Sequence, residues 1–266
     1  MRLTLLGTGN AMVTECYNTC FVLSDGERHL LVDGGGGNGI FAQLKRARIA
    51  VSSIHDIIVT HKHVDHILGV VWLMRLIGQK MLRDQYQGDV NIYAHDEVIG
   101  LLREMAHFLL QSKVVKLLDD RLHLITVSAG EQREIIGHSL TFFDIHSTKA
   151  KQYGFCLQLD ETRRLTCCGD EPYSEGAALY APHSAWLLHE AFCLHGQADI
   201  YHPYEKHHST VKDACELAER LQVENLVLYH TEDDNIAQRE KLYRAEGEKY
   251  YRGTLYIPND LDVLEL

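Results

Sequence analysis

The sequence predicts an α/β protein, or α+β in some schemes, in which two sheets pack face to face with helices outside them. Short apolar runs typical of strands recur in both halves of the chain, and stretches with a helical period lie between them. The chain has only four prolines and no proline- or serine-rich linker, so we expect residues 1–266 to form a single domain. Hydrophobic residues at 45% and charged residues at 24% exclude a disordered chain or a coiled coil.

The first half is expected to begin with a three-stranded meander and to continue with alternating helices and strands. Its strands are expected at residues 2–6, 20–23, 29–32, 57–59 and 90–94. Its helices are expected at residues 40–48, 67–77 and 96–113, the last capped by Asp96.

The second half repeats the mixture. Its strands are expected at residues 122–127, 140–145, 154–159, 165–168, 186–188 and 226–229, with a closing strand near residue 255. Thr210 and Asp213 form a capping-box pattern ahead of one helix, and a last helix is expected at residues 236–250.

Charge and cysteine content limit the class of protein. The chain has 26 basic and 37 acidic residues, a formal net charge of −11, so any polyanionic substrate must be held by local features. The seven cysteines lack paired C-x-x-C spacing, which indicates reduced thiols, and adjacent Cys167 and Cys168 are expected to be buried. The longest apolar run, residues 67–74, is too short to cross a bilayer, and no basic leader precedes an apolar segment. We therefore expect a cytoplasmic protein that does not bind membranes.

The most specific motif is H-x-H-x-D-H, formed by His61, His63, Asp65 and His66 directly after a buried strand. A loop that leaves a strand can direct all four side chains toward one cavity. Neutral imidazole and carboxylate are ligands that suit zinc, manganese or iron, so the motif predicts a metal site. The alternative is a solvated polar turn.

Four residues cannot complete the shells of two metal ions, and further ligands are expected at strand ends. His146, Asp170 and His230 each follow an apolar run directly. A hydrogen-bonded polar residue at a strand end is the alternative for each of them. Recurrence of the same placement beside the H-x-H-x-D-H motif favours ligands.

Taken together, these motifs resemble the metallo-β-lactamase superfamily, and within it the ribonuclease Z branch. The matching segments span residues 2–231: Leu6-Gly7-Thr8-Gly9, Val32-Asp33-Gly34, the H-x-H-x-D-H motif, Cys168-Gly169-Asp170, Leu188-His189-Glu190-Ala191, His207-His208-Ser209-Thr210 and Leu228-Tyr229-His230-Thr231. The resemblance implies a four-layer αβ/βα sandwich of two packed mixed sheets with outer helices.

The resemblance also implies two divalent metal ions, zinc first and manganese or iron as alternatives. It assigns one ion to His61, His63 and His146, the other to Asp65, His66 and His230, and a bridging role to Asp170. Such a pair lowers the pKa of a shared water and holds a phosphate oxygen. Asp65 resembles the family residue that accepts the proton of that water.

His208, supported by Glu190, resembles the family's proton donor for the leaving alkoxide, because a neighbouring carboxylate raises an imidazole's pKa and fixes its tautomer. Glu190 could instead form a salt bridge, and His207 could be the active imidazole. Asp33 resembles a carboxylate that orients a ligand histidine, with a turn-capping role as the alternative. Residues 34–37 lack phosphate-loop spacing, which favours the permissive backbone of glycine as the reason for their glycines.

Three departures from ribonuclease Z point to a substrate smaller than transfer RNA. The interval between His146 and Asp170 has no room for the basic arm that the tRNA-processing enzymes usually carry there. Carboxylates at residues 232–234 follow His230 and would repel a polyanion. Residues 194–207 contain three histidines and two tyrosines, which either line the pocket or form a solvated loop.

The sequence therefore predicts a metal-dependent hydrolase, foremost a phosphodiesterase that acts on a small phosphodiester or on RNA. A lactone or thioester hydrolase of the same fold remains an alternative. A di-iron redox or sensor protein, or a non-catalytic metal-binding protein, is a further one. The family resemblance also implies a homodimer.

Overall fold

Two seven-stranded sheets form the framework of the chain, and each belongs to its own compact unit. The computed structural model describes residues 1–266. The first unit consists of Met1–Gly7, Tyr17–Ser128 and Asp260–Leu266, and the second of Thr8–Cys16 and Ala129–Asn259. Both units combine a mixed sheet with helices, which confirms the predicted fold class. The single domain stays a prediction.

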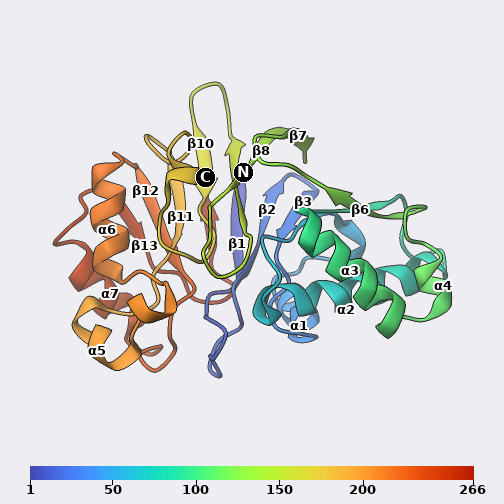
Figure 1. The fold of residues 1–266 in the computed structure, drawn as a ribbon, viewed down its shortest axis with the longest axis horizontal. Coiled ribbons are helices and arrows are strands. Elements are labelled where there is room, and N and C mark those ends of the chain that lie inside the picture. The colour runs from blue at the N-terminus through green and yellow to red at the C-terminus, as the bar shows by residue number, and fades with distance from the viewer. The chain divides into compact units, whose positions relative to one another are not determined.

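The sheet of the first unit has the order β14-β1-β2-β3-β4-β5-β6. Its strands are β1 Arg2–Gly7, β2 Cys20–Asp25, β3 Arg28–Val32, β4 Ile54–Ile58, β5 Val90–Ala94, β6 Leu122–Thr126 and β14 Val263–Glu265. Strands β14, β1, β2 and β3 pair antiparallel, which confirms the predicted meander, and β3 to β6 pair parallel. Because β14 pairs with β1, the two termini lie side by side (Figure 1).

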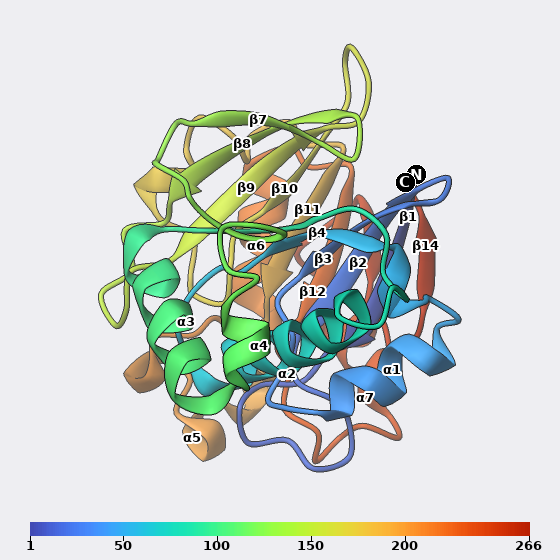
Figure 2. The ribbon, with the colours of Figure 1, turned by 90° about the vertical axis from the view of Figure 1, so that its right-hand side faces the viewer.

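Four helices cover one face of this sheet (Figure 2). They are α1 Gly39–Arg46, α2 Val64–Met81, α3 Asp96–Leu109 and α4 Ser112–Val115, and a short 3₁₀ turn, η1 Val51–Ser53, precedes β4. Ile67, Val70 and Leu73 of α2 share one buried core with Ile57 and Ile92 of the sheet. Burial of this apolar stripe, at about 1.5–3 kcal/mol per large side chain, fixes the direction in which α2 leaves the sheet.

The predicted cap of α3 is wrong. His95 is the N-cap residue, Asp96 is the first helical residue, and no side chain caps the helix. Asp96 still lies in the first turn, where the helix dipole favours a carboxylate. The expected single helix over residues 96–113 ends at Leu109, and α4 follows as a separate turn.

The sheet of the second unit has the order β13-β12-β11-β10-β9-β8-β7. Its strands are β7 Gln132–Ile135, β8 His138–Asp144, β9 Tyr153–Gln158, β10 Arg164–Cys167, β11 Trp186–Glu190, β12 Asn225–Tyr229 and β13 Thr254–Tyr256. Strands β7 to β10 pair antiparallel and β10 to β13 pair parallel.

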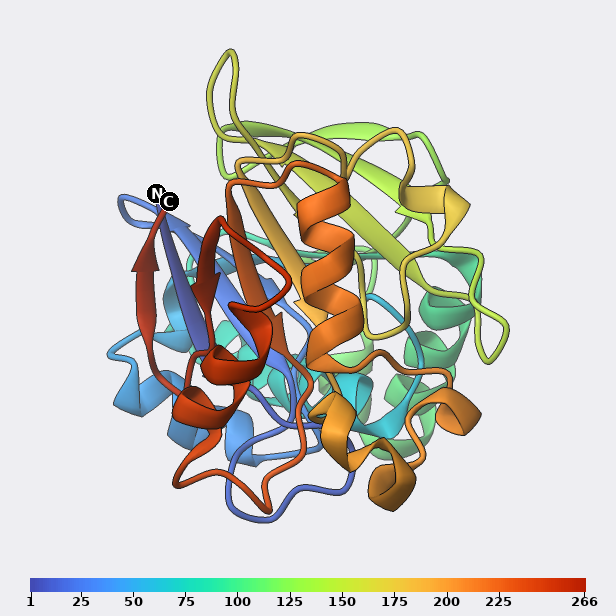
Figure 3. The same ribbon diagram turned by 90° about the vertical axis from the view of Figure 1, so that its left-hand side faces the viewer.

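Helices α6 Val211–Arg220 and α7 Arg239–Gly247 lie against this second sheet (Figure 3). The predicted capping box of α6 is confirmed, because Thr210 accepts from the Asp213 amide and the Asp213 carboxylate accepts from the Thr210 amide. Short helical turns fill the remaining connections: η2 Glu175–Ala177, η3 His195–Gln197, α5 Ala198–Tyr201 and η4 Tyr204–Lys206.

Each sheet brings polar residues together at one edge. The parallel strands β3 and β4 are followed by Asp33 and by the H-x-H-x-D-H motif. In the second sheet, β10, β11 and β12 end at or just before Asp170, Glu190 and His230. Because carboxyl ends of parallel strands share an edge, this topology collects the candidate site residues of each unit.

The cysteines and the helices agree with the expectations for them. All seven cysteines are free, and Cys167 and Cys168 are buried as predicted. Burial raises the pKa of the Cys168 thiol above its ordinary value. None of the helices combines the length and the apolar character needed to cross a bilayer.

Candidate metal centre

The H-x-H-x-D-H motif spans the connection from β4 to α2. His61 and His63 precede the helix, with His63 as its N-cap residue, and Asp65 and His66 lie in its first turn. His61, Asp65 and His66 are buried and His63 is partly buried. The N-terminus of α2 favours the buried negative charge of Asp65. One turn of helix thus holds two of the predicted ligands, and the loop before it holds the other two.

Asp33 fixes the tautomers of two of these histidines. His66 Nδ1 donates to Asp33 Oδ2 at 2.7 Å, so Nε2 is the acceptor nitrogen when the His66 ring is neutral. The Thr60 hydroxyl donates its one proton to the same Asp33 oxygen at 2.7 Å. It must therefore accept from His61 Nδ1, which lies 3.0 Å away, so His61 Nε2 is also an acceptor. Both rings thus present the nitrogen that a metal ion requires.

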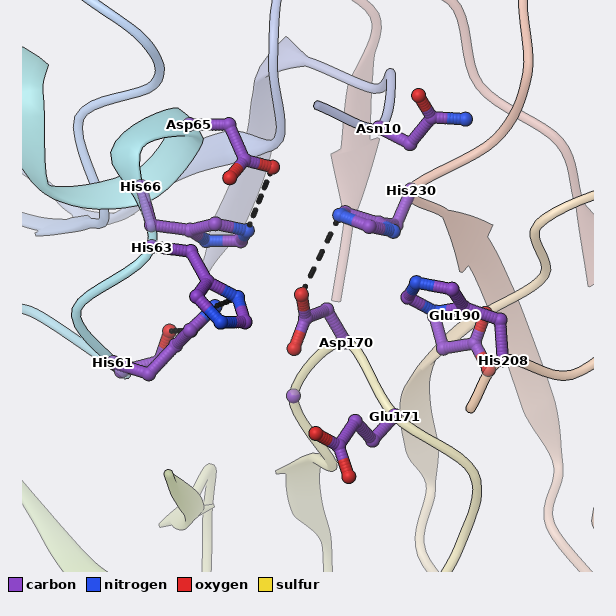
Figure 4. Close-up of polar contacts among 12 residues, drawn as sticks. Asn10, His61, His63, Asp65, His66, Asp170, Glu171, Glu190, His208 and His230 are labelled. Atoms are coloured by element: carbon purple, nitrogen blue, oxygen red, sulfur yellow. Dashed lines mark hydrogen bonds and ion pairs between the residues drawn. The ribbon is translucent and has the colours of Figure 1, made fainter. Parts of the chain in front are cut away.

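Other contacts of the first unit agree with this arrangement. His61 Nε2 lies 2.9 Å from His63 Nδ1, and Asp65 Oδ2 lies 3.4 Å from His66 Nε2 (Figure 4). Burial lowers the pKa of His66, but the charges of Asp33 and Asp65 and their hydrogen bonds outweigh burial and hold that pKa well above its usual value. The ring therefore faces a strongly negative environment that favours a cation.

The glycine-rich turn after Asp33 serves packing. A Cβ on Gly69 of α2 would lie 1.8 Å from the carbonyl oxygen of Gly34, and a Cβ on Gly34 would lie 2.4 Å from the amide nitrogen of Val70. The turn and the helix therefore approach backbone to backbone. This contact places the first turn of α2 beside Asp33, in agreement with the expected role of the glycines.

In the second unit, Asp170 and His230 form a pair. Asp170 Oδ2 lies 3.5 Å from His230 Nε2, and Gln152 Nε2 donates to Asp170 Oδ1 at 2.6 Å (Figure 4). Both residues are buried. His230 has a φ of 58°, and Gly169 before Asp170 has a φ of 79°. The left-handed backbone costs a non-glycine residue about 1–3 kcal/mol, and such strain is concentrated at functional sites.

His146 differs from the other predicted ligands because its side chain is exposed. Its backbone is also left-handed, with a φ of 55°, and its amide donates to Asp144 Oδ1 at 2.7 Å. His146 thus lies just after the end of β8, as the sequence predicts. The ligand role assigned to His146, beside His61 and His63, stays a prediction.

The geometry favours His208 over His207 as the imidazole beside Glu190. His208 Nδ1 lies 3.6 Å from Glu190 Oε2, and the other oxygen of this fully buried carboxylate accepts from the Ser209 amide. The His208 ring stacks on Phe192 at 4.8 Å and lies 5.2 Å from the His230 ring. His207 is exposed, and its Nδ1 contacts Thr148 Oγ1 at 3.3 Å.

The carboxylates after His230 have structural partners. Glu232 is buried and accepts from Asn235 and from the Tyr243 hydroxyl. Asp233 accepts from the amides of Thr14 and Glu15, and Asp234 accepts from the Tyr201 hydroxyl at 2.7 Å. These charges hold loops of the second unit. Within residues 194–207, Tyr201 takes part in this network, whereas the exposed Tyr204 donates from its hydroxyl to Asp213 Oδ2 at 2.9 Å.

Three contact residues were missed by sequence reasoning. Gln152 orients Asp170, Phe192 supports the His208 ring, and Lys149 lies 3.5 Å from His208 Nε2. Phe192 directly follows the His189-Glu190-Ala191 segment, which is the only signal that could have found it. Gln152 and Lys149 lie in a connection without any motif.

A family comparison supplies the identity of the chain. Residues 1–248 match the family model described as Anti-Pycsar protein Apyc1. The chain belongs to this Apyc1 family. The matched residues include every candidate ligand.

The Apyc1-family chain is also similar to ribonuclease Z. It is 25% identical over 277 residues to ribonuclease Z of Crocosphaera subtropica, with 86% of each chain covered. Human tRNase Z, short form, matches with a TM-score of 0.75 and 20% identity over 100% of this chain and 99% of that one. The metallo-β-lactamase fold protein YhfI from Bacillus subtilis matches with a TM-score of 0.79 and 16% identity, covering 99% and 98%.

These findings confirm the predicted superfamily, the ribonuclease Z-like branch and the metallo-β-lactamase fold.

Proposed function

We propose that the protein is a metal-dependent phosphodiesterase for a small nucleotide diester, with a nucleoside cyclic monophosphate as the favoured substrate. The observation that carries the proposal is the buried Glu190–His208 pair, whose imidazole lies 5.2 Å from the ring of the ligand candidate His230. A proton donor at this position suits an alkoxide leaving group, which a phosphodiester supplies.

We propose two divalent ions, with zinc first and manganese or iron as alternatives. The proposed ligands are His61, His63, Asp65, His66, His146, Asp170 and His230. The fit rests on the donor chemistry: His61 and His66 present acceptor nitrogens because Asp33 and Thr60 engage their Nδ1 atoms. When bound, the ions would stabilise negative charge on the phosphate and lower the pKa of water.

The protein residues divide the proton transfers between them. Asp65 is proposed to accept the proton of the attacking water. His208 is proposed to give a proton from Nε2 to the leaving oxygen, while Glu190 faces Nδ1 and stabilises the imidazolium. The buried Glu190 carboxylate is held in place by the Ser209 amide, so the donor ring keeps its orientation.

The short segment between His146 and Asp170 supports a substrate smaller than transfer RNA. Residues 147–169 contain only β9, β10 and their connections, and no inserted arm that could bind transfer RNA. The net charge of −11 disfavours a polyanion, whereas a cyclic mononucleotide brings one phosphate charge and one base. The family is described as an anti-Pycsar protein, and we extend that role to this chain. A homodimer and a cytoplasmic location remain further parts of the proposal.

The test compares leaving groups in metal-loaded protein. We expect His208→Ala to slow hydrolysis of a cyclic mononucleotide by about 10²- to 10⁴-fold, because a ribose alkoxide needs a proton. It should change hydrolysis of bis-p-nitrophenyl phosphate far less, because p-nitrophenolate leaves without one. His207→Ala is the matched control and should retain both activities.

Equal losses on both substrates would contradict the proton-donor role of His208. Faster hydrolysis of acyl-homoserine lactones than of any diester would instead support the lactone or thioester alternative. Metal analysis of the purified protein distinguishes zinc or manganese from the di-iron alternative.

A further inference from the structure

Lys149 lies at the Nε2 edge of the His208 ring, whereas Glu190 lies near Nδ1. The Lys149 Nζ atom is 3.5 Å from His208 Nε2 and donates to the Lys206 carbonyl oxygen at 3.0 Å. The Lys149 side chain is 24% exposed, so the ammonium group is partly desolvated. A cation therefore stands at the nitrogen from which the proposed proton transfer occurs.

Hydrogen bonds hold the loop that contains Lys149 in place. Ser147 Oγ donates to Glu171 Oε1 at 2.5 Å and accepts from the amides of Lys149 and Ala150 at 3.2 Å each. Thr148 contacts His207 at 3.3 Å. The position of Lys149 is thus set by the hydrogen bonds of the loop between β8 and β9, on both sides of the residue.

The charges around His208 are divided between its two nitrogens. Glu190 faces Nδ1, whereas Lys149 faces Nε2. Glu171 Oε1 lies 3.8 Å from Lys149 Nζ and offsets part of its charge. Lys206 Nζ lies 5.1 Å from the ring of Phe192, on which His208 stacks, and adds a second cation. Lys149 is therefore the cation that contacts Nε2, in a chain whose net charge is −11.

We infer that Lys149 binds the phosphate anion of the substrate and thereby selects anionic esters, an inference that rests on the proposed function. An ammonium group has three donors, so Lys149 can keep its bond to Lys206 and donate to a phosphate oxygen as well. Such a charge-assisted bond is about twice as strong as a neutral one. The short loop thus provides the local cation that an acidic protein needs for an anionic substrate.

The test measures binding and turnover separately. Lys149→Met, Lys149→Arg and the control Lys151→Met are compared with the parent protein, all metal-loaded; Lys151 contacts the Tyr153 ring. Calorimetry with inorganic phosphate should show binding weakened about 10- to 100-fold in Lys149→Met. Lys149→Arg should stay within a few-fold of the parent, and Lys151→Met should equal it.

Kinetics separate anion binding from a disturbed His208. Lys149→Met should raise KM for a cyclic mononucleotide and for bis-p-nitrophenyl phosphate by similar factors, leaving the ratio of their kcat values unchanged. A changed ratio would show that Lys149 acts by holding His208, and would overturn the inference.

The two proposals fail in different ways. Unchanged phosphate binding in Lys149→Met, or no measurable phosphate binding by the parent protein, overturns the role of Lys149 whatever the activity. If the parent protein binds phosphate through Lys149 but hydrolyses no diester, the anion site stands and the phosphodiesterase proposal fails.

Discussion

Asp33 Oδ2 accepts a hydrogen bond from His66 Nδ1 at 2.7 Å, and the same oxygen accepts from the Thr60 hydroxyl. One buried carboxylate thereby orients His66 directly and His61 through Thr60. The expected role of Asp33, to orient a ligand histidine, agrees with these contacts. Asp33 has a φ of 58°, in the left-handed region, which is a strained backbone conformation for a residue other than glycine.

Asp33→Asn should weaken metal binding by about 10- to 100-fold, because an amide cannot accept from His66 and Thr60 as a carboxylate does. Competition with a chelating dye measures the affinity. Asp56→Asn is the control, since Asp56 accepts from Tyr93 and Asn91 within the same sheet and touches no candidate ligand. Equal affinity in the parent protein and Asp33→Asn would show that Asp33 only shapes the turn.

Metal binding should release a proton from His66. Burial lowers the pKa of His66, but the charges and hydrogen bonds of Asp33 and Asp65 outweigh burial and hold this pKa well above its usual value, which favours the protonated ring in the metal-free protein. Because the pKa is raised on folding, the stabilisation is present below about pH 6.5 and is lost as pH rises through the folded-state pKa. Metal affinity should rise over the same interval.

Calorimetry of metal binding in buffers with different ionisation enthalpies counts that proton. His66→Gln should release fewer protons than the parent protein at pH 7. Proton release that does not change in this variant would show that His66 is already neutral in the metal-free protein.

Gly69→Ala should destabilise the fold by at least about 1–3 kcal/mol, because its Cβ would lie 1.8 Å from the Gly34 carbonyl oxygen. Gly100→Ala is a matched control: Gly100 also lies in a helix, and its Cβ would meet nothing within 4 Å. That variant should stabilise the protein by about 0.8–1 kcal/mol. Urea unfolding measures both, and equal stabilities would contradict the close packing of turn and helix.

The main elements could be predicted from the sequence because their apolar periodicity is strong, as in α6 with its capping box. The edge strands β7 and β14 were missed because most of their residues are exposed and show no apolar pattern. The helix that begins at Asp96 was predicted with the wrong cap, because acidic residues favour both the N-cap and the first turn.

The candidate site was predictable where a motif carries it. His61, His63, Asp65 and His66 lie close together in sequence, and Asp170 and His230 follow clear strands. Gln152 and Lys149 could not be predicted, because they lie in the loop between β8 and β9. Only the fold of this loop brings Gln152 to Asp170 and Lys149 to His208. The exposure of His146 also depends on the local backbone at the strand end, which no spacing specifies.

The most direct measurement is the initial rate of the metal-loaded protein on a cyclic mononucleotide and on a transfer RNA precursor, side by side, with Asp65→Ala as the inactive reference. A small phosphodiesterase should turn over the cyclic nucleotide, leave the precursor intact and lose activity in Asp65→Ala. Cleavage of the precursor at its 3′ trailer, with the cyclic nucleotide untouched, would contradict the proposed substrate.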